Sequence, residues 1–463
     1  MIAYSGPVRV RMIFQKCGGI FVKFGQMLAL RADVLPTPIA YELLNLLEHL
    51  PPISTKKIRQ TIEKELQAPV EHLFPWFDNT PLAVASFAQV HQAKLPDGRT
   101  VIVKVQKPWI DNMVSVDLKI LKLLAAVLDA VLGHRPITMR EVIKEFSLWT
   151  MQELDYIREA ETVEQFHACM TLPWVTAPYI MWQYTSKRVL TETYMEGMSL
   201  SNHIELPYHA DNPLIAKKLL ESISDQYFLK GFFHADPHPG NILVDTSTGM
   251  LTYIDFGMTG RTTHEHRQAM ARFIYHAFRG DYEASIHSFL KLGFSRRLAR
   301  DRKMLEHDQQ FARMFDFTIP VVERLVVEQF SHIMRKWQHA IKDPEAPFHQ
   351  KSAAAAFLSF LSVASRYRIT LDREIILFIK ALVAVDAISL QLDPTFNLLE
   401  TINAIFSKSD YQHLFSTAVE LPQELHIFEN RVDEERIHQL KDYYTDWMGS
   451  LMEMHEKEFN QYI

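Results

Sequence analysis

Apolar residues recur at helical spacing along most of the chain. Near the N-terminus, Ile58, Ile62 and Leu66 follow one another every four residues, which places them on one face of a helix. Ser54 and Thr55 stand just before this stripe, and hydroxyl side chains at that position cap helices. The same spacing predicts further helices over residues 139–170 and 214–229 and over nearly all of the chain after residue 264.

A strand-rich stretch interrupts this helical pattern. β-Favouring residues fill Ala83–Lys94 and Thr100–Val105, and Pro96-Asp97-Gly98 lies between them, which predicts a hairpin. Shorter strand-like runs stand at residues 174–183, 189–194, 242–244 and 251–254. The order of a helical N-terminus, a small sheet and a large helical region predicts an α+β fold with the strands clustered in one lobe.

Composition narrows the possible classes of protein. The 463 residues include 49 lysines and arginines against 55 aspartates and glutamates, and this slightly acidic balance argues against nucleic-acid binding as the main function. Cys17 and Cys169 are far apart and have no metal-binding partners beside them. They are typical of small buried residues in a reducing compartment.

The apolar segments are too short or too interrupted to span a bilayer, which needs about 20 apolar residues. Ala353–Ala364 is short, and Ile375–Leu390 contains Lys380 and Asp386. Residues 1–16 lack the apolar core of a secretory signal. We expect a cytoplasmic protein that is soluble or bound peripherally to a membrane.

One run of residues has the spacing of a phosphoryl-transfer site. It extends from His234 to Asn241 and is followed by Asp255-Phe256-Gly257. Phosphoryl transfer from a nucleotide requires a carboxylate near the acceptor, oxygen ligands for Mg²⁺ and a cation on the phosphates. A kinase loop supplies Asp and then Asn, and a following strand brings the Asp of Asp-Phe-Gly to the metal. Asp236 is therefore the candidate catalytic residue, and Asn241 and Asp255 are the candidate Mg²⁺ ligands.

Two other interpretations of this run remain open. One is a polar turn followed by a chance Asp-Phe-Gly. The other is a transition-metal site, because His234, Asp236 and His238 alternate, and alternate residues of an extended segment point to one side. Pro237 and Pro239 argue against a straight strand there.

A lysine on a β-branched strand is the candidate cation for the phosphates. Lys104 ends the run Val101–Lys104, and a strand lysine of this kind reaches the nucleotide phosphates in kinases. The alternative is a solubilising lysine on an edge strand. A helix carboxylate must hold such a lysine, and Glu153 is the first choice as partner of Lys104 or of another lysine, with Asp155 and Glu159 nearby. The alternative for these acids is a solvated helix face.

The segment that should cover the phosphates is rich in alanine. Kinases place a glycine-rich loop before the lysine strand, but here the equivalent positions read Ala83, Val84, Ala85 and Ser86. Each Cβ limits how closely the backbone approaches a phosphate. These four residues are our candidates for nucleotide contact through Ser86 and backbone amides, in a different pose from that of ordinary kinases.

Together these segments resemble the UbiB/AarF family of atypical, protein-kinase-like proteins, over roughly residues 18–397. The motifs that carry the resemblance are Lys23-Phe24-Gly25-Gln26, the alanine-rich stretch Ala83–His91, Glu153-Leu154-Asp155, the run His234–Asn241 and Asp255-Phe256-Gly257. The resemblance implies a two-lobed protein-kinase-like fold, a helical N-terminal extension over the active site, and a mostly helical C-lobe and tail.

The resemblance also implies an activity. It implies an atypical kinase or ATPase that uses ATP and Mg²⁺ and supports ubiquinone (isoprenoid quinone) biosynthesis or lipid homeostasis. The implied partners are an isoprenoid quinone precursor or lipid and quinone-biosynthesis proteins, at most peripherally on the inner membrane. The implied roles are phosphate binding for Lys104, acid/base catalysis for Asp236, Mg²⁺ binding for Asn241 and Asp255, and gating by Lys23, Gln26, Glu153 and Asp155.

Two segments depart from the family pattern. Cys17-Gly18-Gly19-Ile20 stands where the family often has Thr or Pro, and Val189–Tyr194 lacks the usual Met-Glu order of the hinge. Adenine recognition at a hinge uses backbone groups, so binding can survive, and Thr193 is our candidate for that contact. Selectivity for the base is left open.

We divide the chain into four parts. They are an N-terminal extension (residues 1–72), an N-lobe (73–195), a C-lobe (196–400) and a helical tail (401–463). The tail segment 434–462 is rich in aromatic residues and methionine, so it either packs on the core or docks on a membrane or partner.

Two rival functions remain beside the kinase or ATPase. The first is a non-catalytic, nucleotide-gated scaffold that binds lipid or partner proteins. The second is a small-molecule kinase of the aminoglycoside or choline type, which shares the spacing of Asp236 and Asn241. The Lys23–Gln26 signature argues against the second, because that class has no such extension.

Overall fold

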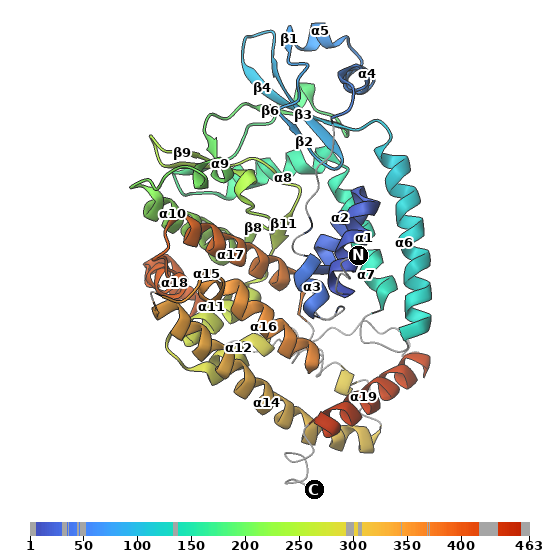
Figure 1. Ribbon diagram of the computed structural model, residues 1–463, viewed down its shortest axis with the longest axis vertical. Helices are drawn as coiled ribbons and strands as arrows, with labels where there is room; N and C mark the ends of the chain where they lie inside the picture. Colours follow the sequence, from blue (N-terminus) through green and yellow to red (C-terminus); the bar gives the residue numbers. More distant parts are fainter. Residues whose placement is uncertain are drawn as a thin grey trace, which may run out of the picture.

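The protein has two lobes, as the computed structural model shows (Figure 1). The structure describes residues 6–29, 35, 37–43, 46, 52–132, 138–292, 301–303, 308–343, 345–367, 369, 371–415 and 434–454. A small sheet forms one end of the molecule and helices form most of the rest. The predicted α+β, kinase-like, two-lobed fold with a helical N-terminal extension and a mostly helical C-lobe is confirmed.

The N-lobe sheet has the strand order β1-β3-β4-β6, with β2 paired to β3. Its strands are β1 (Trp76–Phe77), β2 (Ala83–Val84), β3 (Ala88–Lys94), β4 (Thr100–Gln106) and β6 (Val189–Thr193). The predicted hairpin is confirmed, since β3 and β4 pair antiparallel and Gly98 takes the positive φ of 88° that their turn requires.

Alternation along β4 decides where Lys104 points. Val101, Val103 and Val105 are buried against Ile58 and Ile62, which lie on α4 (Thr55–Leu66). Lys104 therefore projects from the opposite face of the sheet, toward the other lobe. The helix predicted from Ile58, Ile62 and Leu66 is confirmed as α4. Its expected cap is not formed, because the Ser54 side chain makes no capping bond and the Thr55 hydroxyl instead donates to the Asn79 carbonyl at 2.7 Å.

The predicted single helix over residues 139–170 is wrong, because the chain breaks in its middle. α7 (Met139–Glu153) ends at Leu154, and α8 (Tyr156–Cys169) begins after Asp155. The Asp155 carboxylate accepts a hydrogen bond from the Ile157 amide at 3.2 Å, which caps α8. α6 (Ile110–Leu132) precedes them and packs along α7.

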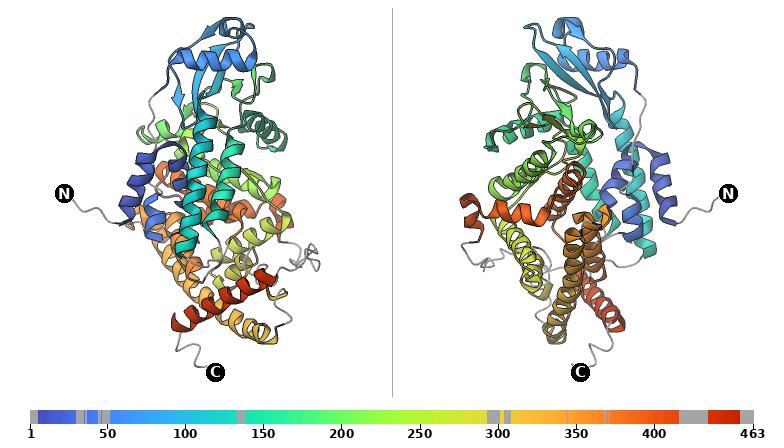
Figure 2. Two further views of the ribbon diagram at one scale, coloured as in Figure 1. Left: turned by 90° about the vertical axis from the view of Figure 1, so that its right-hand side faces the viewer. Right: turned by 60° about the vertical axis from the view of Figure 1, so that its left-hand side comes forward.

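The N-terminal extension packs beside α6 and α7 (Figure 2). The helices of the extension that pack there are α1 (Gly6–Cys17), α2 (Gly19–Ala29) and α3 (Thr37–Leu43), whereas α4, also within residues 1–72, packs on the N-lobe sheet. Phe24 of α2 lies 5.0 Å from the Phe146 ring of α7, and Gly25 packs so closely that a Cβ there would lie 2.4 Å from the side chain of Leu46. This close approach explains the glycine at that position.

The C-lobe combines two small sheets with many helices. Its strands are β5 (Val175–Thr176), β7 (Met198–Ser199), β8 (Phe232–His234), β9 (Ile242–Asp245), β10 (Met250–Tyr253) and β11 (Thr259–Arg261). The hairpin of β9 and β10 carries the chain from the Asn241 loop to Asp255. The expected strand over residues 174–183 is wrong in extent, since only two of its residues form β5 and a short 3₁₀ helix, η1 (Trp182–Tyr184), follows.

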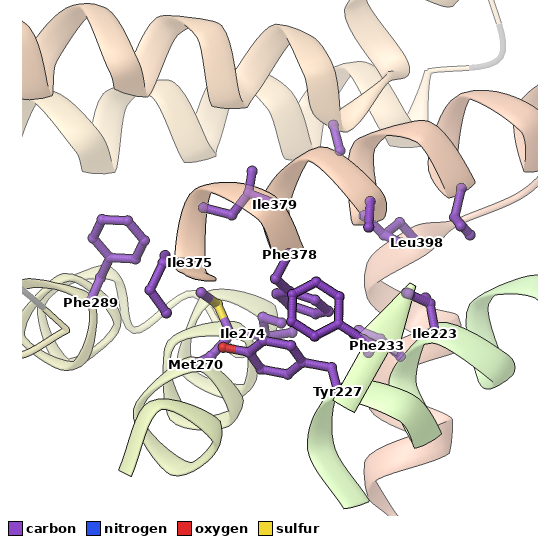
Figure 3. Packing of buried hydrophobic residues seen from close by; sticks show 14 of the residues in the cluster. Ile223, Tyr227, Phe233, Met270, Ile274, Phe289, Ile375, Phe378, Ile379 and Leu398 are labelled. Carbon is purple, nitrogen blue, oxygen red and sulfur yellow. The ribbon is translucent and has the colours of Figure 1, made fainter. Parts of the chain in front are cut away.

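The helices of the C-lobe enclose one large apolar core (Figure 3). They are α9 (Leu200–Ile204), α10 (Asn212–Ser224), the π-turn η2 (Asp225–Lys230), α11 (His264–Phe278), α12 (Tyr282–Leu290), α14 (Gln309–Lys342), α15 (Phe348–Lys351), α16 (Ala353–Arg366), α17 (Arg373–Leu392) and α18 (Leu398–Phe406). The expected helix 214–229 therefore ends in a π-turn. Phe378 of α17 stacks on Tyr227 at the centre of this core.

Two helices bear on membrane binding. α17 is long and apolar enough to cross a bilayer. However, it packs along α10 inside the core, and a buried core helix can have the same length and apolar composition. α19 (Glu434–Met454) buries Tyr444 and Trp447, and the Tyr444 hydroxyl donates to Asp301 at 2.7 Å. Both contacts favour a tail helix packed on the core.

Candidate active site

A cavity of about 750 Å³ lies between the N-lobe sheet, α2, α7 and α17. It collects most of the side chains with predicted roles, although they come from distant parts of the chain. The charged and amide residues among them are Lys23, Gln26, Lys104, Glu153, Asp236, Asn241 and Asp255. A volume of this size is in the range of small-molecule sites.

Lys104 is held by Glu159. The Lys104 Nζ lies 2.8 and 3.1 Å from the two Glu159 carboxylate oxygens and 3.6 Å from Asp255 Oδ2. Burial by itself lowers the pKa of Lys104, but Asp255 and Glu159 outweigh burial and hold the pKa well above its ordinary value. Lys104 therefore stays charged.

The expected pairing of Lys104 with Glu153 is wrong, because the break before Asp155 separates the two acids. Glu153 ends α7, whereas Glu159 lies on α8 beneath the sheet. Glu153 instead pairs with another lysine, Lys23 of α2, which is the second partner that the sequence analysis allowed.

The Lys23–Gln26 motif faces the cavity. Lys23 lies 4.1 Å from the centre of the Phe87 ring in addition to its contact with Glu153. Gln26 donates its amide to the Leu46 carbonyl at 3.1 Å. The two side chains thus join the extension to α7, to the alanine-rich loop and to the segment after α3.

Only part of the predicted nucleotide-contact set lines the cavity. Ala85 and Ser86 do so, together with Phe87 and Ala88. Ala83 and Val84 form β2 and pair with β3. Thr193 ends β6, and its backbone amide donates to the Tyr179 carbonyl at 2.9 Å. Nucleotide contacts by Ala83, Val84 and Thr193 stay predictions.

The loop after β8 presents Asp236 and Asn241. The side-chain nitrogen Nδ2 of Asn241 donates to the backbone carbonyl oxygen of Asp236 at 3.2 Å. This bond leaves the side-chain oxygen Oδ1 of Asn241 available for a cation. Burial raises the pKa of Asp236, but Lys380 outweighs burial and holds the pKa below its ordinary value. Asp236 therefore stays ionised.

Asp255 lies beside Lys104 in the cavity, with its Oδ2 3.6 Å from the Lys104 Nζ. Its Oδ1 accepts a hydrogen bond from the Gly257 amide at 2.9 Å. Burial raises the pKa of Asp255, but Lys104 outweighs it and keeps the pKa lowered. Phe256 packs 4.9 Å from the Phe166 ring of α8, so the Asp-Phe-Gly turn and the helix that carries Glu159 support each other.

The oxygen ligands fit Mg²⁺ better than a transition metal. Asn241 and Asp255 place an amide oxygen and an ionised carboxylate in one cavity, and Mg²⁺ typically takes one or two protein oxygens together with phosphate oxygens. The two histidines of the alternative site are already bonded within the protein: His234 is buried against the Asp255 carbonyl, and His238, which lines the cavity, accepts from the Gly240 amide at 3.1 Å through Nδ1.

Lys380 is a cavity residue that was not predicted from the sequence. Its Nζ lies 2.7 Å from Asp236 Oδ1, and it lines the cavity with Arg373, Ile376 and Leu377, which share one face of α17. The sequence does carry a signal, because Lys380 interrupts an apolar helix, but by itself that signal argues only against a membrane span.

Glu192 is a buried acidic residue near Lys104 that was also not predicted from the sequence. It lies on β6, on the face of the sheet that carries Lys104, and is buried. Burial raises the pKa of Glu192 to about 8, so this side chain is mainly protonated at neutral pH.

These features define a protein-kinase-like protein. They are a strand lysine paired with a helix carboxylate, an Asp and an Asn in one loop, and Asp-Phe-Gly after the next hairpin. Residues 45–289 match the ABC1 atypical kinase-like domain, and residues 344–397 match the UbiB helical domain. The chain belongs to this ABC1/UbiB family of atypical kinase-like proteins.

Two relatives are similar in sequence over more than half of the chain. The "Probable protein kinase UbiB" of Marinobacter nauticus is 31% identical over 401 residues, which cover 85% of this chain and 68% of the relative. "Protein ACTIVITY OF BC1 COMPLEX KINASE 7, chloroplastic" of Arabidopsis thaliana is 33% identical and covers 59% of this chain and 40% of its own length.

A solved structure also resembles the chain. It is the Rv3197–erythromycin complex from Mycobacterium tuberculosis, with 26% identity, a TM-score of 0.46, and coverage of 61% of this chain and 71% of that one. A TM-score this low adds nothing to the assignment, which rests on the family matches.

Proposed function

We propose that the chain binds Mg-ATP in this cavity and transfers or hydrolyses its terminal phosphoryl group. The observation that carries the proposal is the position of Lys104, 3.6 Å from Asp255, in the same cavity as Asp236 and Asn241. A cation for the phosphates, oxygen ligands for Mg²⁺ and a carboxylate near the acceptor are the groups that phosphoryl transfer requires.

Each residue has a separate task in this proposal. Lys104 binds the nucleotide phosphates, and Asn241 and Asp255 hold Mg²⁺, which neutralises charge on the phosphates. Asp236 orients the attacking hydroxyl or water and accepts its proton, for which its ionised state is required. Ser86 and the neighbouring backbone contact the nucleotide from above.

The acceptor is a small molecule rather than a protein segment. α2 contributes Lys23, Gln26 and Met27 to the cavity wall, and the family resemblance implies that such an extension lies over the active site. The family resemblance supplies the metabolic setting, so we place the activity in isoprenoid-quinone or lipid metabolism, on a protein bound at most peripherally to a membrane. Lys23 and Glu153 act as the gate of the cavity.

Measuring ATP turnover tests the proposal. Purified protein should hydrolyse ATP with Mg²⁺, with or without lipid or a mimic of the quinone head group, and Asp255→Asn should lower turnover at least about a hundredfold. Full turnover by Asp255→Asn would refute the metal assignment. Thermal shifts with Mg-ATP on wild type and on Lys104→Ala measure binding independently of turnover.

The scaffold alternative has a distinct outcome. If wild type binds Mg-ATP but shows no turnover with any lipid, the protein is a nucleotide-gated scaffold. Deleting the gene and profiling quinones tests the metabolic setting, since an unchanged quinone profile would contradict it.

A further inference from the structure

We propose that Lys380 is a catalytic cation for the transferred phosphoryl group, supplied to the kinase-like site by a helix of the C-terminal region. The inference rests on the proposed function and adds a residue to it. Lys380 lies in the segment that matches the UbiB helical domain, outside the kinase-like domain match, yet its Nζ lies 2.7 Å from Asp236 Oδ1.

The catalytic loop has no cation of its own. Between Asp236 and Asn241 the chain reads Pro237-His238-Pro239-Gly240, without lysine or arginine. A cation at the acceptor end of the cavity must therefore come from another element. Lys380 occupies this place from α17.

Among the residues that the structure describes, two other lysines line the cavity, and both pair with other acids. Lys104 pairs with Glu159 at the phosphate-binding sheet, and Lys23 pairs with Glu153 at the extension. Of the three, Lys380 is the one that contacts the catalytic carboxylate. Each lysine thus serves a different wall of the cavity.

The core fixes the helix that carries Lys380. Phe378 stacks on Tyr227, and Ile375 and Phe378 are fully buried. The helix therefore carries Lys380 on a rigid support, which is the requirement for a preorganised electrostatic group. A lysine in such an apolar helix costs free energy through desolvation, and its pairing with Asp236 offsets part of that cost.

The chemistry of the step follows from the position. The acceptor oxygen forms a bond to the terminal phosphorus of ATP while the bond from that phosphorus to the bridging oxygen breaks, and ADP leaves. The acceptor proton passes to Asp236. Lys380 donates a hydrogen bond to a non-bridging oxygen of the transferred group, where it offsets the negative charge. Removal of such a group typically costs about a hundredfold or more in kcat.

The test compares Lys380→Met and Lys380→Gln with Lys380→Arg. We expect both neutral variants to lower kcat for ATP about a hundredfold, with the affinity for Mg-ATP, measured by thermal shift, changed less than about threefold. Lys380→Arg should recover part of kcat because the charge is kept. Lys408→Met is the matched control, since Lys408 pairs with Glu221 outside the cavity lining, and it should leave kcat unchanged.

Recovery of kcat by Lys380→Arg, together with a nearly unchanged affinity for Mg-ATP, separates a catalytic charge from a contact that only stabilises the fold. Full kcat in either neutral variant, beside an active wild type, would overturn the inference and leave the proposed function standing. A wild type that binds Mg-ATP without turnover would overturn the catalytic role of Lys380 but not the binding site, and a wild type that does not bind Mg-ATP would overturn both.

Discussion

Lys104 and Glu159 lie 55 positions apart in the chain, and their charged atoms lie 2.8 Å apart. The pair joins the N-lobe sheet to α8, and Glu159 also accepts a long hydrogen bond, at 3.4 Å, from the Phe256 amide. One carboxylate therefore links the strand lysine to the Asp-Phe-Gly turn. The state of this ion pair should govern both stability and nucleotide binding.

Replacing Glu159 by glutamine should destabilise the protein. Removing one partner of a buried ion pair costs about 3–5 kcal/mol, because Lys104 is left with Asp255 at a longer distance. Denaturant unfolding measures the loss. Glu153→Gln is the matched control: its pair with Lys23 is partly exposed, so the expected cost is about 1 kcal/mol or less. Equal costs for the two variants would contradict the assignment of Glu159 as the buried partner.

Gly25→Ala should loosen the N-terminal extension. The new Cβ would lie 2.4 Å from Leu46 Cδ1 and 3.0 Å from Phe14 Cδ1, and overpacking of this kind costs about 1–3 kcal/mol. Gly449→Ala in α19 is the control, because its Cβ meets nothing within 4 Å and should stabilise the helix by up to about 1 kcal/mol. Amide hydrogen exchange on α1 to α3 should rise in the first variant alone; unchanged exchange would show that the extension absorbs the methyl group.

Asp386 should make stability fall as pH rises. Its Oδ2 accepts from the Ala353 amide at 2.6 Å and from the Ser352 hydroxyl at 3.1 Å, but burial outweighs these bonds and raises the pKa of Asp386 from 3.8 to about 7. For an acid whose folded-state pKa is raised, the stabilisation is present at low pH and is lost as pH rises from about 4 to about 7.

A shift of this size corresponds to about 4 kcal/mol across that window. Asp386→Asn should remove this contribution, since asparagine cannot ionise. The measurement is the free energy of unfolding of both proteins between pH 4 and pH 8. Parallel curves for wild type and variant would show that Asp386 does not titrate in this range.

Trp447→Ala tests whether the tail helix packs on the core. Trp447 is buried within the large C-lobe cluster, so its truncation should cost about 3–5 kcal/mol. Thr445→Ala, an exposed position on the same helix, should change stability by less than about 0.5 kcal/mol. If Trp447→Ala instead leaves stability unchanged and weakens binding to lipid vesicles, the tail is a membrane-docking helix.

The local motifs could be predicted from the sequence. Asp236, Asn241 and Asp255 lie within one loop–hairpin–loop unit, so their spacing alone predicted that they would share a site, and the cavity contains all three. The hairpin around Gly98 was equally predictable, because its turn residues and flanking strands are adjacent in the chain. Their roles toward ATP and Mg²⁺ remain predictions.

Ion-pair partners that depend on a helix break could not be predicted from the sequence. Glu153 and Glu159 stand in one continuous helical pattern, and only the cap at Asp155 separates them into two helices with different directions. Ala83 and Val84 pair with β3 as strand residues, and their contact with the nucleotide stays a prediction. Hydrophobic periodicity predicts a helix but not a one-residue break within it, and such a break changes the direction of every later side chain.

The sequence by itself determined that Asp236, Asn241 and Asp255 form one kinase-like unit, because they lie in a short segment whose order is local, and the family resemblance singled out Lys23 and Gln26. Only the tertiary structure decided which carboxylate holds Lys104 and which cation meets Asp236. Glu159 and Lys380 reach the cavity through the packing of α8 and α17 against distant elements. Such contacts depend on how the elements fold together, and no local spacing along the chain encodes them.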